Sequence, residues 1–286
     1  MNRPDAPIVV GPGSQPAEED GRQLHYPMPD GDMSTFSAPR IPEPEEIKGR
    51  ETAIALLHEL QARLAGYDVG QPPLVLPLHG LDAANLALVD QLLGNGEVSA
   101  TCHGALEARI QESVLAGVWR VQYLDGKGGV ARDVIEIAAI PGLIREASFD
   151  GAAGQLGLDE VEIPDDVYNA PPLLAEIDAQ LARHTPGRLP HVINLSLLPH
   201  SNEDIEFLSA TLGSGPVVIL SRGYGNCRIT STATRHVWWV QYFNSQEILI
   251  LNTLEISEVP AVACAAQEDI DDSAQRLLEI LEVFRG

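Results

Sequence analysis

The sequence predicts an α+β fold in which one helix-plus-antiparallel-sheet unit occurs twice, related by a pseudo-twofold axis and preceded by a Pro-rich N-terminal tail. Three observations lead to this prediction. Segments of helical periodicity alternate with β-rich segments, similar residues recur at one constant offset along the 286 residues, and nine of the 21 prolines fall within residues 1–47. We expect residues 48–149 to form the first unit, 150–170 a linker, and 171–286 the second unit.

The repeat becomes visible when the sequence is shifted by 119 positions. Residues 117–123 (GVWRVQY) then align with residues 236–242 (HVWWVQY), and residues 93–98 (LGNGEV) align with residues 212–217 (LGSGPV). One offset holds over both stretches without a gap, which we interpret as a tandem duplication.

The tail and the first elements of each unit follow from composition and spacing. Proline removes backbone donors and blocks helices, so residues 1–47 are expected to be extended or disordered. Apolar residues at helical spacing predict amphipathic helices over 54–64 and 174–181. Short apolar runs at 74–78 and 192–195 predict strands.

A second helix is expected in each unit, with signals at both ends. Asp82 and Ser201 are suitable N-caps, and Gly94 and Gly213 suit the positive φ that commonly ends a helix. The Gly-x-Gly turns at these ends follow helices and lack a Gly-Lys-Ser/Thr sequence, so we interpret them as helix ends and not as phosphate loops.

The remaining segments predict an antiparallel meander in each unit and a final helix. The turn at 126–129 (GKGG) favours a hairpin, and apolar spacing predicts a helix over 270–284. The expected strands are 97–103, 108–124 with a break, and 130–139 in the first unit, and 216–222, 227–243 and 247–256 in the second.

Composition excludes several classes of function. Lys plus Arg number 18 and Asp plus Glu 41, which gives a net charge of −23. Such a chain is poorly suited to nucleic acid, which requires a basic face, whereas it attracts basic partners. No apolar run approaches the roughly 18 residues that a membrane span needs, and no secretory signal is visible at the N-terminus. We therefore expect a cytoplasmic protein with no membrane insertion.

The cysteines and histidines do not form a recognisable metal or cofactor motif. Cys102, Cys227 and Cys264 are odd in number and far apart, without a CxxC pair. The sequence therefore predicts no metal site and no cofactor. Five histidines are scattered and are interpreted as ordinary surface or loop residues, namely His58, His79, His184, His191 and His200.

Candidate site residues come from positions at which the second unit departs from the first. If 222–228 and 230–236 form a hairpin, the special residues of the second unit converge at one end of the sheet. A Cys near a His is also the minimal pair for nucleophilic chemistry, although no orienting group or oxyanion donor can be identified. The partner-binding candidates are Arg222, Gly223, Tyr224, Gly225, Cys227, Arg235 and His236.

Taken in order, five motifs resemble the HupH/HyaF family, of which HoxQ is a further member. These are accessory proteins encoded with uptake nickel-iron hydrogenases. The resemblance covers essentially the whole chain and is densest in the second unit. The motifs are GPGSQP at 11–16, INLSLLP at 193–199, GYG at 223–225, RHVW at 235–238, and ED at 268–269 followed by DSAQRL at 272–277.

The resemblance implies a non-catalytic maturation factor for a nickel-iron hydrogenase. It implies a protein that assists the iron-sulfur small-subunit precursor, which carries a basic twin-arginine signal peptide, before export. It also implies a thioredoxin-like companion of the HyaE/HoxO type. The alternative is a thiol-dependent enzyme that uses Cys227 and His236 in cofactor or cluster assembly. A Cys227→Ser variant separates the two classes, because only the enzyme would lose nearly all activity.

Trp119 and Tyr123 align with Trp238 and Tyr242 and are predicted to be equivalent core residues. Replacing either tryptophan with Ala should lower the free energy of unfolding by about 3–5 kcal/mol, because a large buried side chain is removed. Chemical denaturation of the purified variants measures this loss. A loss below about 1 kcal/mol in either variant would show that the tryptophan is not buried as core.

Overall fold

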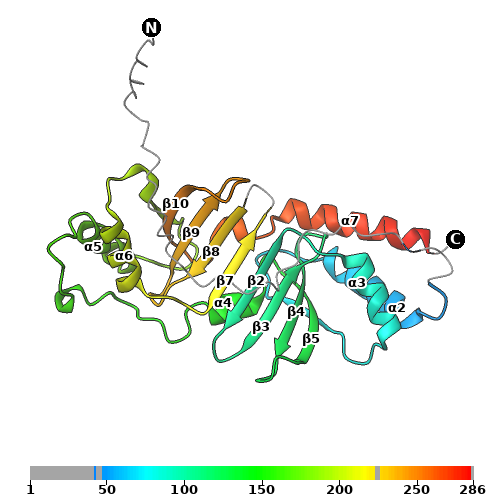
Figure 1. Cartoon of the computed structure of the whole chain (residues 1–286). Helices are drawn as coiled ribbons and strands as arrows, with labels where there is room; N and C mark the ends of the chain where they lie inside the picture. Colours follow the sequence, from blue (N-terminus) through cyan, green and yellow to red (C-terminus); the bar gives the residue numbers. More distant parts are fainter. Residues whose placement is uncertain (1–41, 43–46, 223–225, 285–286) are drawn as a thin grey trace, which may run out of the picture. The chain divides into compact units, whose positions relative to one another are not determined.

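The computed structural model describes residues 42, 47–222 and 226–284. The Pro-rich tail predicted for residues 1–47 lies almost wholly outside this range. Within it, ten strands form one antiparallel sheet, with helices packed on its faces (Figure 1). The α+β class predicted from the sequence is therefore confirmed.

The first half of the described chain runs from the first helix through the meander to a short helix. The strand predicted over 108–124 is broken into two antiparallel strands, and the 126–129 turn closes a hairpin through Asp125 N–H, which donates to Gly129 O at 2.7 Å. The elements are α2 (Glu51–Leu64), β1 (Leu74–Pro77), α3 (Ala83–Leu93), β2 (Val98–His103), β3 (Glu107–Glu112), β4 (Val118–Leu124), β5 (Val130–Ile137) and α4 (Gly142–Ala147).

The second half repeats this order of helices and strands. Its long predicted strand, 227–243, is likewise two strands, and the last helix begins three residues earlier than predicted, at Gln267. The elements are η1 (Leu158–Glu160), α5 (Ala170–Leu181), β6 (His191–Asn194), η2 (Leu195–Leu197), α6 (Asn202–Leu212), β7 (Val217–Ser221), β8 (Asn226–Ser231), β9 (Val237–Phe243), β10 (Leu249–Ile256), η3 (Ala261–Ala263) and α7 (Gln267–Val283).

Strand order mirrors itself about the middle of the sheet. The order is β1-β5-β4-β3-β2-β7-β8-β9-β10-β6, so each half contributes five adjacent strands and β2 pairs with β7. Strand registers also recur at the offset of 119. Trp119 lies opposite Glu136 in the first half, and Trp238 lies opposite Glu255 in the second.

The predicted helix ends of α3 and α6 are confirmed. Asp82 accepts hydrogen bonds from the backbone N–H groups of the first turn of α3, and Ser201 forms a capping box with Asp204 at the start of α6. Gly94 and Gly213 end the two helices at φ 54° and 65° with ψ near 180°. That backbone region is essentially open only to glycine.

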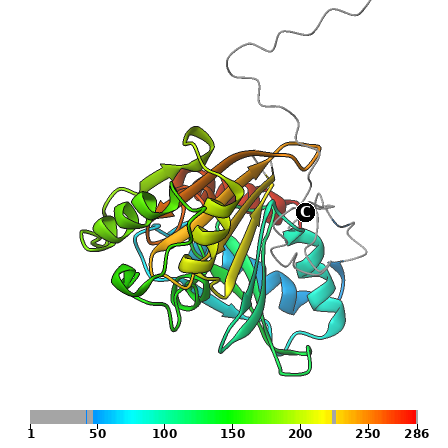
Figure 2. The ribbon, with the colours of Figure 1, turned by 60° about the vertical axis from the view of Figure 1, so that its left-hand side comes forward.

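Three apolar clusters hold the sheet and the helices together. One lies on a single face of the sheet, spans both halves, and contains Trp119 and Trp238. On the opposite face, the first half packs against α2, α3 and α7, and the second half packs against α5 and α6 (Figures 1 and 2). The C-terminal helix of the second half therefore completes the core of the first.

A segment that follows the first half likewise packs against the second half. After α4, the chain crosses to the second half, where Ala153 N–H donates to Ala233 O at 2.9 Å and Arg235 N–H donates to Ala153 O at 2.8 Å. Phe149 packs edge-on against Trp238, with ring centroids 5.1 Å apart. Each half therefore carries a segment that packs against the other. The boundaries predicted at 48–149, 150–170 and 171–286 stay predictions.

Leu277 on α7 tests this cross-packing, because its side chain is 1% exposed within the cluster of the first half. We expect Leu277→Ala to lower the free energy of unfolding by about 2–5 kcal/mol. Hydrogen exchange should then increase in α2 and β5 before it increases in α5 and α6. Glu282→Ala, on the exposed side of the same helix, is the control. An exchange increase confined to the second half would contradict the assignment.

Candidate functional site

The partner-binding residues predicted from the sequence lie in two separate places. Arg222 is exposed directly after β7, and Gly223, Tyr224 and Gly225 lie outside the described residues. Cys227 is near the start of β8. Arg235 and His236 belong to the turn between β8 and β9.

Among the described candidates, the predicted convergence of Cys227 with Arg235 and His236 is wrong. The hairpin is formed by residues 226–231 and 237–243, with Cys227 opposite Tyr242 and Ser231 opposite Trp238. Cys227 therefore lies at the end of β8 remote from the turn that holds His236. At about 3.3 Å of rise per strand residue, the four steps from Cys227 to Ser231 alone span about 13 Å. The structure does not form the Cys–His pair.

The Cys227 thiol is also poorly suited to nucleophilic chemistry. The residue is 3% exposed, and burial raises the pKa of its thiol to about 12. Burial likewise raises the thiol pKa of Cys102 to about 12 and that of Cys264 to about 11. The reactive form of cysteine is the thiolate, which is depleted at neutral pH when the pKa is raised.

Of the residues predicted as equivalent core, the two tryptophans are fully buried and the two tyrosines are not, and one hydrogen bond differs between the halves. Trp119 and Trp238 are both 0% exposed, and Tyr123 and Tyr242 are half-buried. Trp119 Nε1 donates to Ala138 O at 2.9 Å. Trp238 Nε1 is buried and has no hydrogen-bond partner among the described residues. A buried donor without a partner costs free energy, so the second half carries a penalty at this tryptophan that the first half avoids.

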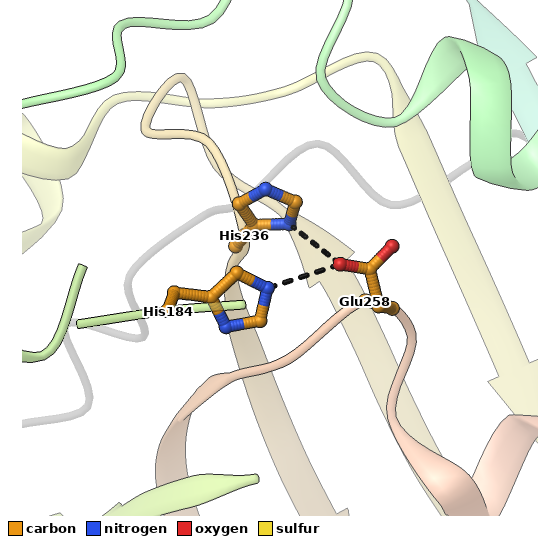
Figure 3. A group of neighbouring side chains, drawn as sticks. All are labelled: His184, His236 and Glu258. Carbon is orange, nitrogen blue, oxygen red and sulfur yellow. Dashed lines mark hydrogen bonds and ion pairs between the residues drawn. The ribbon is translucent and has the colours of Figure 1, made fainter. Parts of the chain in front are cut away.

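His236 lies in a cluster with His184 and Glu258 (Figure 3). Glu258 Oε1 is 3.0 Å from His184 Nε2 and 3.7 Å from His236 Nδ1. One ligand-type atom from each residue lies within 4.8 Å of the other two. The three side chains come from separate segments: the turn after α5, the β8–β9 turn, and the segment directly after β10.

The backbone conformation of His236 sets the direction of its side chain. His236 has φ 65°, and Gly117, at the same place in the β3–β4 turn, has φ 77°. Left-handed backbone is uncommon for residues that carry a Cβ atom. The turn therefore suits glycine, as in the first half, and the second half holds a histidine there at some cost in backbone strain.

Packing and charge set the state of the His236 ring. Its centroid lies 4.2 Å from that of His184 and 5.6 Å from that of Phe149. Burial lowers the pKa of His236; neighbouring His184 and Arg235 lower it further, and Glu258 opposes them. The neutral imidazole, with a lone pair available, is thus favoured.

His184 and Glu258 were missed by sequence reasoning. His184 was interpreted as an ordinary histidine, and no spacing motif links it to positions 236 and 258. The difference between Gly117 and His236 was visible in the repeat, but it marked only one of the three residues. The prediction of no metal site rests on the lack of a spacing motif, and the fold brings three ligand-type side chains together without one.

A cavity of about 430 Å³ lies beside α3 in the first half. Two charged residues, Arg120 and Asp90, line it and pair with each other, and Arg120 also pairs with Asp133 at 2.6 Å. The guanidinium charge is thereby compensated within the protein. The cavity consequently offers weaker recognition chemistry than the His184–His236–Glu258 cluster.

Comparison with known proteins decides the family. The sequence matches the family described as HupH hydrogenase expression protein, C-terminal conserved region, over residues 51–162 and again over 167–284. The chain belongs to the HupH family. This confirms the resemblance inferred from the five motifs. The two matches together contain every helix and strand from α2 to α7.

Relatives within the family are similar along nearly their whole length. Hydrogenase expression/formation protein HupQ of Azotobacter chroococcum mcd 1 is 50% identical over 97% of this chain and 97% of its own. Hydrogenase expression/formation protein HoxQ of Azotobacter vinelandii is 48% identical over 98% and 99%. Hydrogenase-1 operon protein HyaF of Escherichia coli K12 is 33% identical over 96% and 95%.

In the part of this HupH-family chain that the structure describes, no helix is both long enough and apolar enough to span a membrane.

Thiol labelling tests whether this family member exposes a reactive cysteine. At pH 8, the native protein should react with a disulfide reagent far more slowly than free cysteine does, because the Cys102 and Cys227 thiols are buried and have raised pKa values. Unfolding in denaturant should release all three thiols. Rapid labelling of Cys227 in the native state, located by peptide mass, would restore it as a catalytic candidate.

Proposed function

We propose that this protein is a non-catalytic maturation factor for a nickel-iron uptake hydrogenase. In this proposal it binds the precursor of the iron-sulfur small subunit in the cytoplasm, before export through the twin-arginine pathway. The observation that carries the proposal is the near full-length similarity to proteins named hydrogenase expression/formation protein.

The negative net charge of the chain favours binding of a basic partner. The chain carries a net charge of −23, which attracts a basic segment and accelerates encounter. A twin-arginine signal peptide combines a basic N-terminal region with an apolar core. A surface that binds it therefore needs exposed apolar residues as well as negative charge.

Such apolar residues occur together in the second half. Leu197 and Leu198 are 79% and 40% exposed at the end of η2. Ile248, Leu249 and Ile250 are 56%, 42% and 60% exposed at the start of β10. We call these five residues the apolar strip.

The two segments of the apolar strip are held side by side. Ser196 Oγ accepts a hydrogen bond from Asn252 N–H at 2.8 Å, which ties η2 to β10. Contiguous exposed apolar surface on a protein commonly marks an interaction site. We propose that the apolar strip contacts the apolar core of the signal peptide.

The other partner-binding candidates supply two further contact regions in this proposal. Arg222, with Gly223, Tyr224 and Gly225, forms one region, and Arg235 with His236 forms the other. Arginine and tyrosine are residue types that often dominate binding energy. One region would serve the precursor and the other a thioredoxin-like protein of the HyaE/HoxO type. Cys227 is buried and is better regarded as core.

The thiol-dependent alternative receives less support. Cys227 and His236 lie at opposite ends of the β8–β9 hairpin, and burial raises the pKa of the thiol. Neither the distance nor the ionisation favours nucleophilic activation of the cysteine by the histidine.

We also propose that the chain arose by tandem duplication of one helix-plus-sheet unit. Support comes from the constant offset of 119, the mirrored strand order, and the two successive matches to one family description. In this view the common core is inherited, and residues that differ at equivalent positions of the second half carry its specific contacts.

Two binding measurements test the proposed function with purified full-length precursor. Raising the ionic strength from about 0.1 M to 1 M shortens the Debye length from about 10 Å to about 3 Å. The association rate should therefore fall by at least about tenfold, with little change in dissociation. A salt-independent association rate would argue against charge attraction.

In the second measurement, a Leu197→Ser, Ile250→Ser double variant should dissociate at least about 30-fold faster, the equivalent of about 2 kcal/mol. Leu106→Ser, Val130→Ser removes two residues that are 55% and 49% exposed in the first half and should leave the kinetics unchanged. Equal kinetics for the strip variant and the wild type would remove the apolar strip from the interface. Absence of any binding to the precursor would overturn the proposed function.

A further inference from the structure

We propose that His184, His236 and Glu258 form a binding site for one divalent first-row transition-metal ion. This inference does not rest on the proposed function, because it is drawn from the geometry of three side chains and their surroundings. Two imidazole nitrogens and one carboxylate oxygen suit ions such as zinc, iron(II) and nickel(II) better than magnesium or calcium, which prefer oxygen ligands.

Distances between the ligand atoms fit one shared ion. Two atoms that each bind an ion at about 2.1 Å lie about 3.4 Å apart at a tetrahedral angle. The observed separations from Glu258 Oε1 are 3.0 Å to His184 Nε2 and 3.7 Å to His236 Nδ1. These values bracket the expected one, so small side-chain shifts suffice to bind an ion.

His236 Nδ1 is buried and has no competing hydrogen-bond partner in the described chain. Its distance of 3.7 Å from Glu258 Oε1 is too long for a hydrogen bond. Leaving a buried polar atom unsatisfied is unfavourable, and a bound cation would satisfy it.

Backbone strain at His236 is an independent observation that points to the same site. The equivalent turn residue of the first half is Gly117, for which a positive φ carries no steric penalty. In the second half, the φ of 65° is adopted by a residue with an imidazole side chain. Strained residues persist where the side chain has a specific task. Directing Nδ1 toward Glu258 and His184 is such a task.

The surroundings restrict the rings and leave one side open. The side chain of His184 is 8% exposed, and the ring of His236 packs against Phe149 and His184. The side chain of Glu258 is 45% exposed, which gives an ion a route from solvent. Three protein ligands leave a fourth position for water or another ligand, as in catalytic zinc sites.

Unsatisfied polar atoms also occur on two residues next to the cluster. Ser257 precedes Glu258, and its N–H donates to His236 O at 2.9 Å. Its Oγ, like Trp238 Nε1, is buried without a hydrogen-bond partner in the described part of the chain. In the first half, the corresponding Trp119 Nε1 is satisfied by Ala138 O. Such atoms also occur elsewhere in the described chain, on Thr101 and Asn194, but His236, Ser257 and Trp238 bring three of them to this turn and its neighbouring strands.

Two of the three ligands have no counterpart in the first half. At the offset of 119, His236 corresponds to Gly117 and Glu258 corresponds to Ala139. Neither residue can bind a metal ion through its side chain. We therefore expect one ion per chain, not two.

Titration of the untagged, metal-free full chain with zinc or cobalt(II) tests the proposal. Calorimetry should give one ion per chain, and bound cobalt should show d–d absorption bands in the visible region. Loss of a residue that only hydrogen-bonds to a metal ligand already weakens metal binding about 10–100-fold. Loss of a ligand itself should weaken it more. We therefore expect His184→Ala, His236→Gly and Glu258→Gln each to weaken binding by at least about 100-fold.

His236→Gly is the decisive variant because it is expected to fold. It places in this turn the residue that the first half already uses at positive φ, so its unfolding temperature without metal should equal or exceed that of the wild type. Zinc should raise the unfolding temperature of the wild type and leave that of the variant unchanged.

His191→Ala is the matched control, since His191 Nε2 lies 2.7 Å from Glu176 Oε1 in an exposed pair without a third ligand. It should bind metal as the wild type does. The proposal is overturned if the wild type binds neither zinc nor cobalt at micromolar concentrations. It is also overturned if His236→Gly retains wild-type affinity, or if His191→Ala loses as much affinity as His236→Gly.

Discussion

Pairing of β2 with β7 joins the two halves, and the central core depends on it. The five residue pairs from Val98 opposite Ser221 to Cys102 opposite Val217 turn two five-stranded sheets into one. Alternate side chains of these strands then belong to a single apolar cluster that reaches Trp119 and Trp238. Without this junction, β2 and β7 would each become an edge strand with unpaired backbone groups, and the cluster would be divided.

The exchange of segments adds a second constraint. The α7 helix covers α2 in the first half, and the chain around Phe149 and Ala153 packs against the second half. The His184–His236–Glu258 cluster depends on this exchange, because Phe149 supports the ring of His236. A site whose ligands all come from the second half is therefore shaped partly by the first.

Sequence patterns predicted local structure well because the relevant forces act over a few residues. The caps at Asp82 and Ser201 and the burial of both repeat tryptophans follow from local chemistry and periodicity. The β2–β7 junction and the position of α7 could not be predicted, because they depend on tertiary packing. The same applies to the hairpin register: residues 230–236 are suggested as a strand by the sequence, whereas 232–236 form the turn, so Cys227 and His236 lie at opposite ends of β8.

The β3–β4 and β8–β9 turns are equivalent, but Gly117 in the first and His236 in the second have different surroundings. In the first half, Gly117 N–H lies 3.3 Å from Glu112 Oε1, and burial raises the pKa of that carboxyl to about 7. A side chain on Gly117 would meet Ile270 of α7, since a Cβ atom there would lie 2.6 Å from it. Glycine is thus required where α7 packs. In the second half, the ring of His236 packs against Phe149 and His184 at the equivalent turn. Strand pairing on both sides of the turn fixes its backbone, so the strain at His236 is tolerated. The exchange of segments therefore gives the two equivalent turns different neighbours, Ile270 of α7 at Gly117 and Phe149 at His236, and only the second turn carries a histidine.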